Sequence, residues 1–162
     1  MADKMNPTLQ KKWREGFVVG YDCIAFGDGQ IVFANSYSAY DPNTHETTLY
    51  WTPLCDTTLE SLLRYNDDIW TEVDIFRHPL EFDGQKIVFG DGGMGNEGYV
   101  ASVSSDNNLN WSMFFTNSNP IIRAEMDGRT IEAYGETGFI ARINIDDPRE
   151  TSIAHETFKR DG

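Results

Sequence analysis

Apolar and aromatic residues occur along this chain in short runs, and glycine, asparagine, aspartate and proline separate one run from the next. Runs of this kind, rich in Val, Ile, Phe, Tyr and Thr, are typical of β-strands, and their spacing suits hairpins rather than β-α-β units. The pattern therefore predicts an all-β fold with strands at residues 17–19, 23–26, 30–34, 47–51, 86–89, 99–103, 109–115, 121–126, 130–134 and 139–145.

One segment has the periodicity of a helix. Leu59, Leu62 and Leu63 fall on one helical face. Thr57 precedes Glu60 by three residues, which is the pattern of a capping box. We expect a single short helix in this part of the chain, as the one exception to the all-β fold.

The segment 68–76 fits either a helix or a strand. Ile69, Val73 and Phe76 have helical spacing, whereas alignment with residues 111–115 favours a strand. A strand would bury the side formed by Ile69, Thr71, Val73 and Ile75, and it would present on its other side Asp68, Trp70, Glu72, Asp74 and Phe76.

A turn followed by a strand recurs three times along the chain. Asp28-Gly29, Asp83-Gly84 and Asp127-Gly128 each follow a tryptophan and precede an apolar run. Asp-Gly forms tight hairpin turns because glycine adopts positive φ without steric cost. The repeat predicts three antiparallel meanders, arranged as a bent open sheet, a β-sandwich or a partial propeller, near residues 13–51, 70–105 and 111–145.

The second repeat carries a resemblance. Residues 83–90, leading through Gly98-Tyr99-Val100 to Leu109-Asn110-Trp111, resemble the blades of quinoprotein-type or kelch-like β-propellers. A closed propeller usually has four or more blades, whereas this chain has room for about three. The resemblance therefore implies blade-like meanders without a closed ring.

The length of 162 residues predicts one domain, spanning 1–162. We expect its β core at residues 13–146. The apolar alternation stops after that point, so residues 147–162 are expected to be a loose tail or to form a short helix around 152–158.

Acidic residues outnumber basic ones two to one. The chain has 26 Asp and Glu against 13 Lys and Arg, which gives a formal net charge of −13. A field of this sign repels phosphate backbones and anionic lipids, so neither nucleic acid nor a membrane is an expected partner. No run approaches the ~20 apolar residues of a membrane span, and the N-terminus lacks the apolar region of a secretory signal, so we expect a cytoplasmic protein.

The motifs that would mark an enzyme or a metal site are incomplete. No serine or cysteine has a recognisable base and orienting acid, and Cys23 and Cys55 lack CxxC or zinc-ligand spacing, so both are expected to be buried, reduced thiols. Residues 93–98 match G-x-G-x-x-G, but a strand is predicted next, which favours a flexible loop over a phosphate site. The pair Asp67-Asp68 could act as acid and base across a cleft, yet chance neighbours are expected among so many acids. We therefore expect a non-enzymatic protein with no catalytic residue, no metal site and no cofactor.

The sharpest signal is an acidic stretch. Residues 41–97 carry twelve acids against three basic residues. Aromatic anchors among charges are typical of a protein-binding hot spot, and the sign of the charge selects a basic partner. The alternative is that the aromatics belong to the core and the acids merely solvate the sheet. The candidate partner-binding residues are Asp67, Asp68, Trp70, Glu72, Asp74 and Phe76, with Glu60 and Glu81 at the rim.

In size, charge and lack of an active-site motif, the chain is similar to bacterial immunity proteins. These proteins neutralise nuclease toxins of contact-dependent inhibition and polymorphic toxin systems. The resemblance implies a one-to-one complex in which carboxylates cover the RNA-binding cleft of a basic nuclease domain, and no toxin-binding residue transfers from it. The alternative is a propeller-like sensor or scaffold module, as a homodimer, that binds a small ligand or peptide at the glycine-rich loops.

Overall fold

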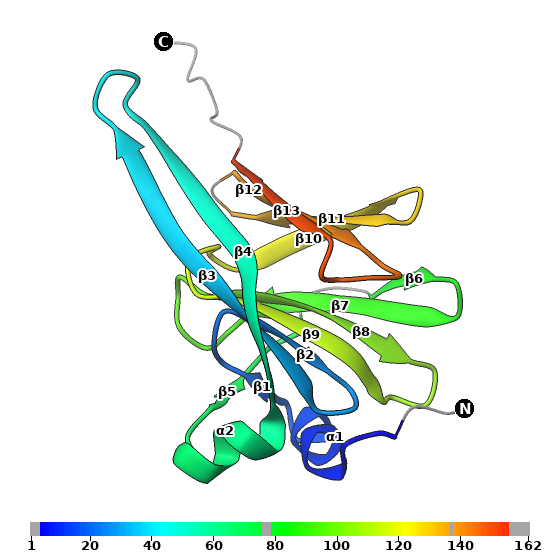
Figure 1. Cartoon of the computed structure of the whole chain (residues 1–162). Helices are drawn as coiled ribbons and strands as arrows, with labels where there is room; N and C mark the ends of the chain where they lie inside the picture. The colour runs from blue at the N-terminus through cyan, green and yellow to red at the C-terminus, as the bar shows by residue number, and fades with distance from the viewer. Residues whose placement is uncertain (1–3, 76–78, 137, 156–162) are drawn as a thin grey trace.

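The computed structural model describes residues 4–75, 79–136 and 138–155 of the chain. Its largest element is an antiparallel sheet of seven strands in the order β4-β3-β2-β9-β8-β7-β6 (Figure 1). These strands are β2 (Cys23–Phe26), β3 (Gln30–Asp41), β4 (Glu46–Thr58), β6 (Leu80–Phe82), β7 (Gln85–Asp91), β8 (Gly98–Ser104) and β9 (Leu109–Phe115).

The other strands form two smaller antiparallel sheets. One has the order β10-β11-β12-β13, and the other is a ribbon of β1 and β5. The strands of these sheets are β10 (Ile121–Asp127), β11 (Thr130–Gly135), β12 (Phe139–Asn144), β13 (Thr151–His155), β1 (Phe17–Val19) and β5 (Trp70–Glu72). The two helices of the described residues are α1 (Pro7–Arg14) and α2 (Leu59–Tyr65).

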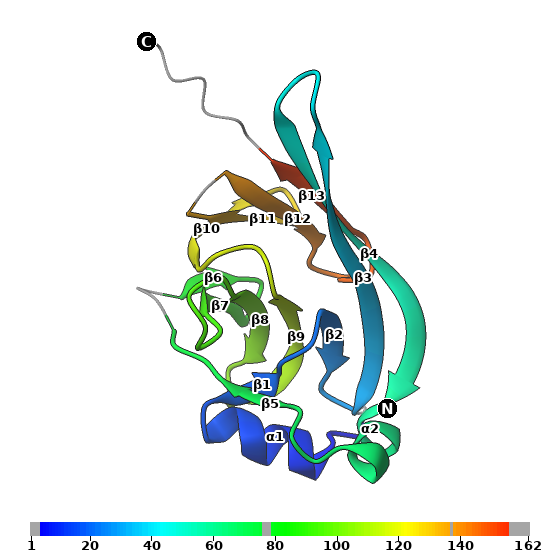
Figure 2. The same ribbon diagram turned by 90° about the vertical axis from the view of Figure 1, so that its left-hand side faces the viewer.

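The seven-stranded sheet is the middle of three layers (Figure 2). One of its faces packs against the four-stranded sheet, with Phe115 and Phe139 in a common cluster and their ring centroids 5.1 Å apart. The opposite face is covered by α1, α2 and the β1–β5 ribbon, where Trp13 and Phe114 belong to a second cluster. Because both faces of the central strands are buried, β8 and β9 are almost continuously apolar.

The three Asp-Gly turns are confirmed. They join β2 to β3, β6 to β7 and β10 to β11, and the glycines Gly29, Gly84 and Gly128 have φ of 93°, 76° and 60°. The first two meanders do not form separate units, because β2 pairs with β9 and joins them into the seven-stranded sheet. The predicted third meander, 111–145, is divided: β9 lies in the seven-stranded sheet, whereas β10, β11 and β12 join β13 in the four-stranded sheet. The all-β prediction with open antiparallel sheets is therefore confirmed.

The hairpin of β3 and β4 is much longer than predicted. β3 continues beyond residue 34 to Asp41, and β4 begins at Glu46 and continues beyond residue 51 to Thr58. The far end of this hairpin projects past both large sheets (Figure 1). We call residues 37–50 of this hairpin the arm; it runs from the pair Tyr37↔Tyr50 to the pair Asp41↔Glu46. The pattern predicted a strand at 47–51 but none at 35–46, because Asn, Ser, Asp, Thr and Pro interrupt the apolar run there.

The expectation of a single helix was wrong. The first helix, α1, begins after Asn6, whose side chain Oδ1 accepts a hydrogen bond from the Leu9 backbone N–H at 3.0 Å. The predicted helix is present as α2, but its N-cap is Thr58 rather than Thr57, and Thr58 Oγ1 accepts from the Ser61 backbone N–H at 3.1 Å. The predicted capping box of Thr57 and Glu60 is therefore absent: with Thr58 as N-cap, the third helical position is Ser61 instead of Glu60.

The predicted tail is wrong for residues 151–155. These residues form β13, which pairs with β12 and places Ile153 opposite Ala141, against the core between the sheets. The pairing supplies the burial that local sequence does not show. The remainder of the predicted tail, 156–162, lies outside the described residues.

Candidate functional site

The acidic segment between α2 and β6 has the alternation that the sequence predicts. Ile69 and Val73 are buried, whereas the carboxylates that flank them are exposed. The hydrogen-bonded strand is shorter than expected, because only Trp70–Glu72 pairs with β1. Ile75, expected on the buried side, is 53% exposed. We call the exposed carboxylates along this segment the acidic surface; they are Asp67, Asp68, Glu72 and Asp74.

Trp70, the aromatic anchor of the predicted site, is partly buried in the core. Trp70 is half-buried and packs against the core beneath the ribbon. The Lys12 ammonium of α1 lies 5.6 Å from the Trp70 ring centroid and 5.3 Å from that of Phe17. Trp70 thus has a structural role, and one cation of the protein itself already lies over it. Phe76, the second predicted anchor, lies outside the described residues.

The two outlying acids of the prediction lie apart. Glu60 is exposed on α2, which follows β4, and is 3.5 Å from Arg64. Glu81 is on β6, opposite Lys86 of β7. Because β4 and β6 are the two edges of the seven-stranded sheet, the structure does not bring Glu60 and Glu81 together.

The glycine-rich loop between β7 and β8 extends the acidic surface. The Asp74 backbone N–H donates to the Asp91 carbonyl oxygen at 3.4 Å, and Gly93 lies close to the backbone of Glu72. The loop therefore places Asp91 next to this segment, while the Glu97 carboxylate accepts a hydrogen bond from the Met94 backbone N–H within the loop. The sequence reasoning assigned neither residue to the site, although both belong to the acid-rich stretch.

Charges around this loop act on one another. Burial raises the pKa of the Glu97 carboxyl, and the nearby Asp22 carboxylate raises it further, against a hydrogen bond from the Met94 backbone N–H that lowers it. The buried Tyr99 phenol has a raised pKa through burial first and then through the carboxylates of Asp74 and Asp91. The loop thus adds negative potential behind the acidic surface.

The four carboxylates of the acidic surface have no ion-pair partner among the described residues, although Lys12 lies over the neighbouring Trp70. The opposite arrangement occurs at the corner of the two large sheets, where Arg129 binds Asp146 at 2.5 Å and Asp83 at 3.2 Å. The hydrogen bonds from the Arg129 guanidinium lower the pKa of the Asp146 carboxyl. The carboxylates where the sheets meet therefore form ion pairs with Arg129, whereas those of the acidic surface form none among the described residues.

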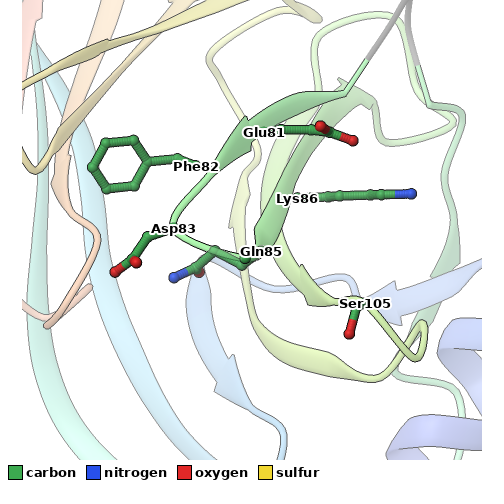
Figure 3. A pocket seen from close by; sticks show the side chains of 7 residues that line it. Glu81, Phe82, Asp83, Gln85, Lys86 and Ser105 are labelled. Atoms are coloured by element: carbon green, nitrogen blue, oxygen red, sulfur yellow. The ribbon is translucent and has the colours of Figure 1, made fainter.

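A second candidate feature is a hollow of about 320 Å³ at the turn between β6 and β7. Figure 3 shows Glu81 and Lys86 pointing away from the side on which Phe82 lies. Asp83 is held by Arg129, and Gln85 accepts a hydrogen bond from the Ser102 hydroxyl. The hollow thus presents one carboxylate and one ammonium from adjacent strands, without a nucleophile held by a base.

The two thiols lie in different environments. Cys23 is buried, and burial raises its pKa, with a smaller contribution from the Asp22 carboxylate. Cys55 is exposed on β4, so the expectation that it is buried was wrong. Across the part of the chain that the structure describes, no group of three or more His, Cys, Asp or Glu side chains is placed to hold a metal ion.

Comparisons of the chain with known protein families, with curated proteins and with solved structures find no match. Neither helix in the described ranges has the length and apolar character needed to cross a bilayer. The functional assignment therefore depends on the geometry of the acidic surface and its surroundings.

Proposed function

We propose that this protein is a non-enzymatic binding protein for a basic protein partner. The class that fits this proposal is an immunity protein that neutralises a basic nuclease toxin by covering its active-site cleft. The observation that carries the proposal is the acidic surface, whose four carboxylates are exposed along one segment and have no cationic partner within the described residues.

An unpaired acidic surface favours a cationic partner in two ways. Long-range attraction raises the rate of association, and complementary charges at the contact suppress partners of the wrong sign. The cleft of a nuclease is basic because it binds phosphates, so carboxylates can occupy the places that phosphates would take. The net charge of −13 adds to the attraction.

The four carboxylates of the acidic surface are not required to keep segment 67–74 in contact with solvent. Segment 67–74 is tied down by Ile69 and Val73 in the core and by the pairing of β5 with β1. Neutral polar side chains would keep the same face in contact with water. Four like charges without counterions instead cost some stability, which is consistent with a role in binding.

The test first asks whether a reading frame beside the gene for this chain encodes a basic nuclease domain, and that domain is then the probe; neighbouring frames without one count against the immunity class. Mixing the two proteins should give a one-to-one complex by size-exclusion chromatography with light scattering, and it should abolish cleavage of an RNA substrate. A complex that leaves cleavage intact, or no complex at all, contradicts the proposal. A stable homodimer that ignores the nuclease would favour the sensor or scaffold alternative.

A charge reversal locates the contact. The double variant Glu72→Lys/Asp74→Lys should weaken inhibition. The control Asp127→Lys/Glu136→Lys changes the net charge by the same amount at exposed positions outside the acidic surface, and it should leave inhibition unchanged. Equal effects of the two pairs would assign the effect to overall charge rather than to the acidic surface. Circular dichroism of each variant checks that the fold is kept.

A further inference from the structure

The arm carries large aromatic side chains that are about half exposed. Tyr37 and Tyr50 are 50% and 41% exposed, and their rings stack across the two strands with centroids 4.8 Å apart and planes 18° apart. A two-stranded ribbon without a core beneath it is marginally stable. The cross-strand stack stabilises this ribbon, and the exposed parts of the two rings are left available for contact with a partner.

The stacked tyrosines belong to the face of the sheet that the helices also cover. Successive residues of a strand alternate between the faces. Trp51, the neighbour of Tyr50, packs with Phe115 between the two large sheets, so Tyr50 and its partner Tyr37 point to the opposite side. Phe33, four residues before Tyr37 on β3, points to that same side and packs against the cluster under the helices.

A chain of contacts links this face to the acidic surface. The Phe33 ring meets the Tyr21 ring edge-on, with centroids 5.9 Å apart. The Tyr21 hydroxyl in turn accepts a hydrogen bond from Asn66 Nδ2 at 3.0 Å, and Asn66 directly precedes Asp67. Tyr37 is about 13 Å along the strand from Phe33. The aromatic face and the acidic surface are therefore parts of one continuous side of the molecule.

The charge on this side selects the chemistry of the partner. Residues 15–63 contain no lysine and no arginine, and the arm carries Asp41 and Glu46 opposite each other beside its turn. Stacked tyrosine rings flanked by carboxylates attract arginine and lysine side chains through their π faces. A second copy of this chain would bring the same acids and a net charge of −13, so it is repelled.

We propose that the tyrosine face, formed by Tyr21, Phe33, Tyr37 and Tyr50, is a second docking surface for a basic protein, whose arginine or lysine side chains lie on the Tyr37 and Tyr50 rings. The inference rests on the proposed function, because it extends the acidic surface toward the same partner. It also replaces the half-buried Trp70 as the exposed aromatic anchor of that interaction.

The test uses a defined cationic probe, a fluorescein-labelled decapeptide of alternating arginine and serine. The same peptide with citrulline in place of arginine is the uncharged control. Fluorescence anisotropy gives the affinity for the wild type, Tyr37→Ser/Tyr50→Ser and Tyr37→Phe/Tyr50→Phe. Tyr40→Ser is the matched control, because Tyr40 is 60% exposed on the same arm and, three residues from Tyr37, points to the other face of the ribbon.

The serine variant should bind the arginine peptide about five- to thirtyfold more weakly, because it removes two exposed cation–π contacts. The phenylalanine variant, which keeps both rings, should stay within about threefold of the wild type. In the wild type, the arginine peptide should shift the ring proton resonances of Tyr37 and Tyr50 and leave those of Tyr40 in place. That measurement does not depend on the folding of any variant.

Several results would overturn the inference. These are an unchanged affinity of the serine variant, an equal loss in the phenylalanine variant, equal binding of the citrulline peptide, or a homodimer that Tyr37→Ser/Tyr50→Ser abolishes. Glu72→Lys/Asp74→Lys separates the two proposals. If only this reversal weakens binding, the tyrosine face fails and the acidic surface stands; if only the serine variant weakens binding, the opposite holds.

Discussion

The side chain of Gln10 forms two reciprocal hydrogen bonds with the backbone of Leu109. Gln10 Nε2 donates to the Leu109 carbonyl oxygen at 2.9 Å, and the Leu109 backbone N–H donates to Gln10 Oε1 at 2.7 Å. Gln10 is 3% exposed on α1, and Leu109 begins β9 next to a register shift between β8 and β9. The amide therefore completes the sheet at a place where no strand does so.

Gln10→Ala should lower the free energy of unfolding by about 2–4 kcal/mol, because it leaves the buried N–H and carbonyl of Leu109 without partners. Gln10→Glu should cost at least as much, since a carboxylate cannot donate to the carbonyl. Urea denaturation measures both. The control is Gln30→Ala, at an exposed position at the start of β3, which should change stability by less than about 0.5 kcal/mol. A loss in Gln10→Ala no larger than in the control would refute the assignment.

The turn of the second meander requires left-handed backbone. Gly84 has φ of 76° and open space around its Cα, so Gly84→Ala meets no clash and is penalised only by its conformation. We expect a loss of about 1–2 kcal/mol in unfolding free energy. Gly95→Ala, in the loop between β7 and β8, also meets nothing and is not in the left-handed region, so it should be nearly neutral. Thermal unfolding of the two variants compares them directly; equal effects would show that the turn is not strained.

Glu97 gives the protein a specific pH dependence. Its pKa is raised in the folded state, chiefly by burial, so ionisation costs stability as the pH rises through the ordinary and then the raised pKa of this carboxyl. Glu97→Gln keeps an acceptor for the Met94 backbone N–H and removes the charge. The variant should be more stable than the wild type at pH 7, and the difference should vanish in acid where Glu97 is protonated. Unfolding measured from pH 3 to pH 8 checks this, and a variant that is less stable at neutral pH would contradict it.

Local sequence was sufficient for much of the fold. The Asp-Gly pairs fixed three turns because glycine at positive φ is a local requirement, and runs such as residues 109–115 were recognisable because both their faces are buried. The local sequence did not indicate α1, a helix of two turns whose only buried apolar residues are Leu9 and Trp13. Nor did it show β13, whose burial comes from pairing with β12.

The candidate site was predictable to a similar extent. Alternation around Ile69 and Val73 placed the acids correctly on an exposed side. The position of Lys12 over Trp70 depends on packing between α1 and β5, which are far apart in the chain, and no local pattern contains it. The contact of Tyr21 with Phe33 likewise requires the tertiary fold.

The central claim is that the acidic surface attracts a basic protein, and its most direct test is the association rate constant with a basic nuclease domain that this protein inhibits. Stopped-flow measurements at about 20 mM and about 0.5 M salt compare the wild type with Glu72→Lys/Asp74→Lys. At low salt the reversal should slow association by about tenfold or more, and at high salt, where the charges are screened, the two proteins should differ little. Equal association rates at low salt would contradict the account.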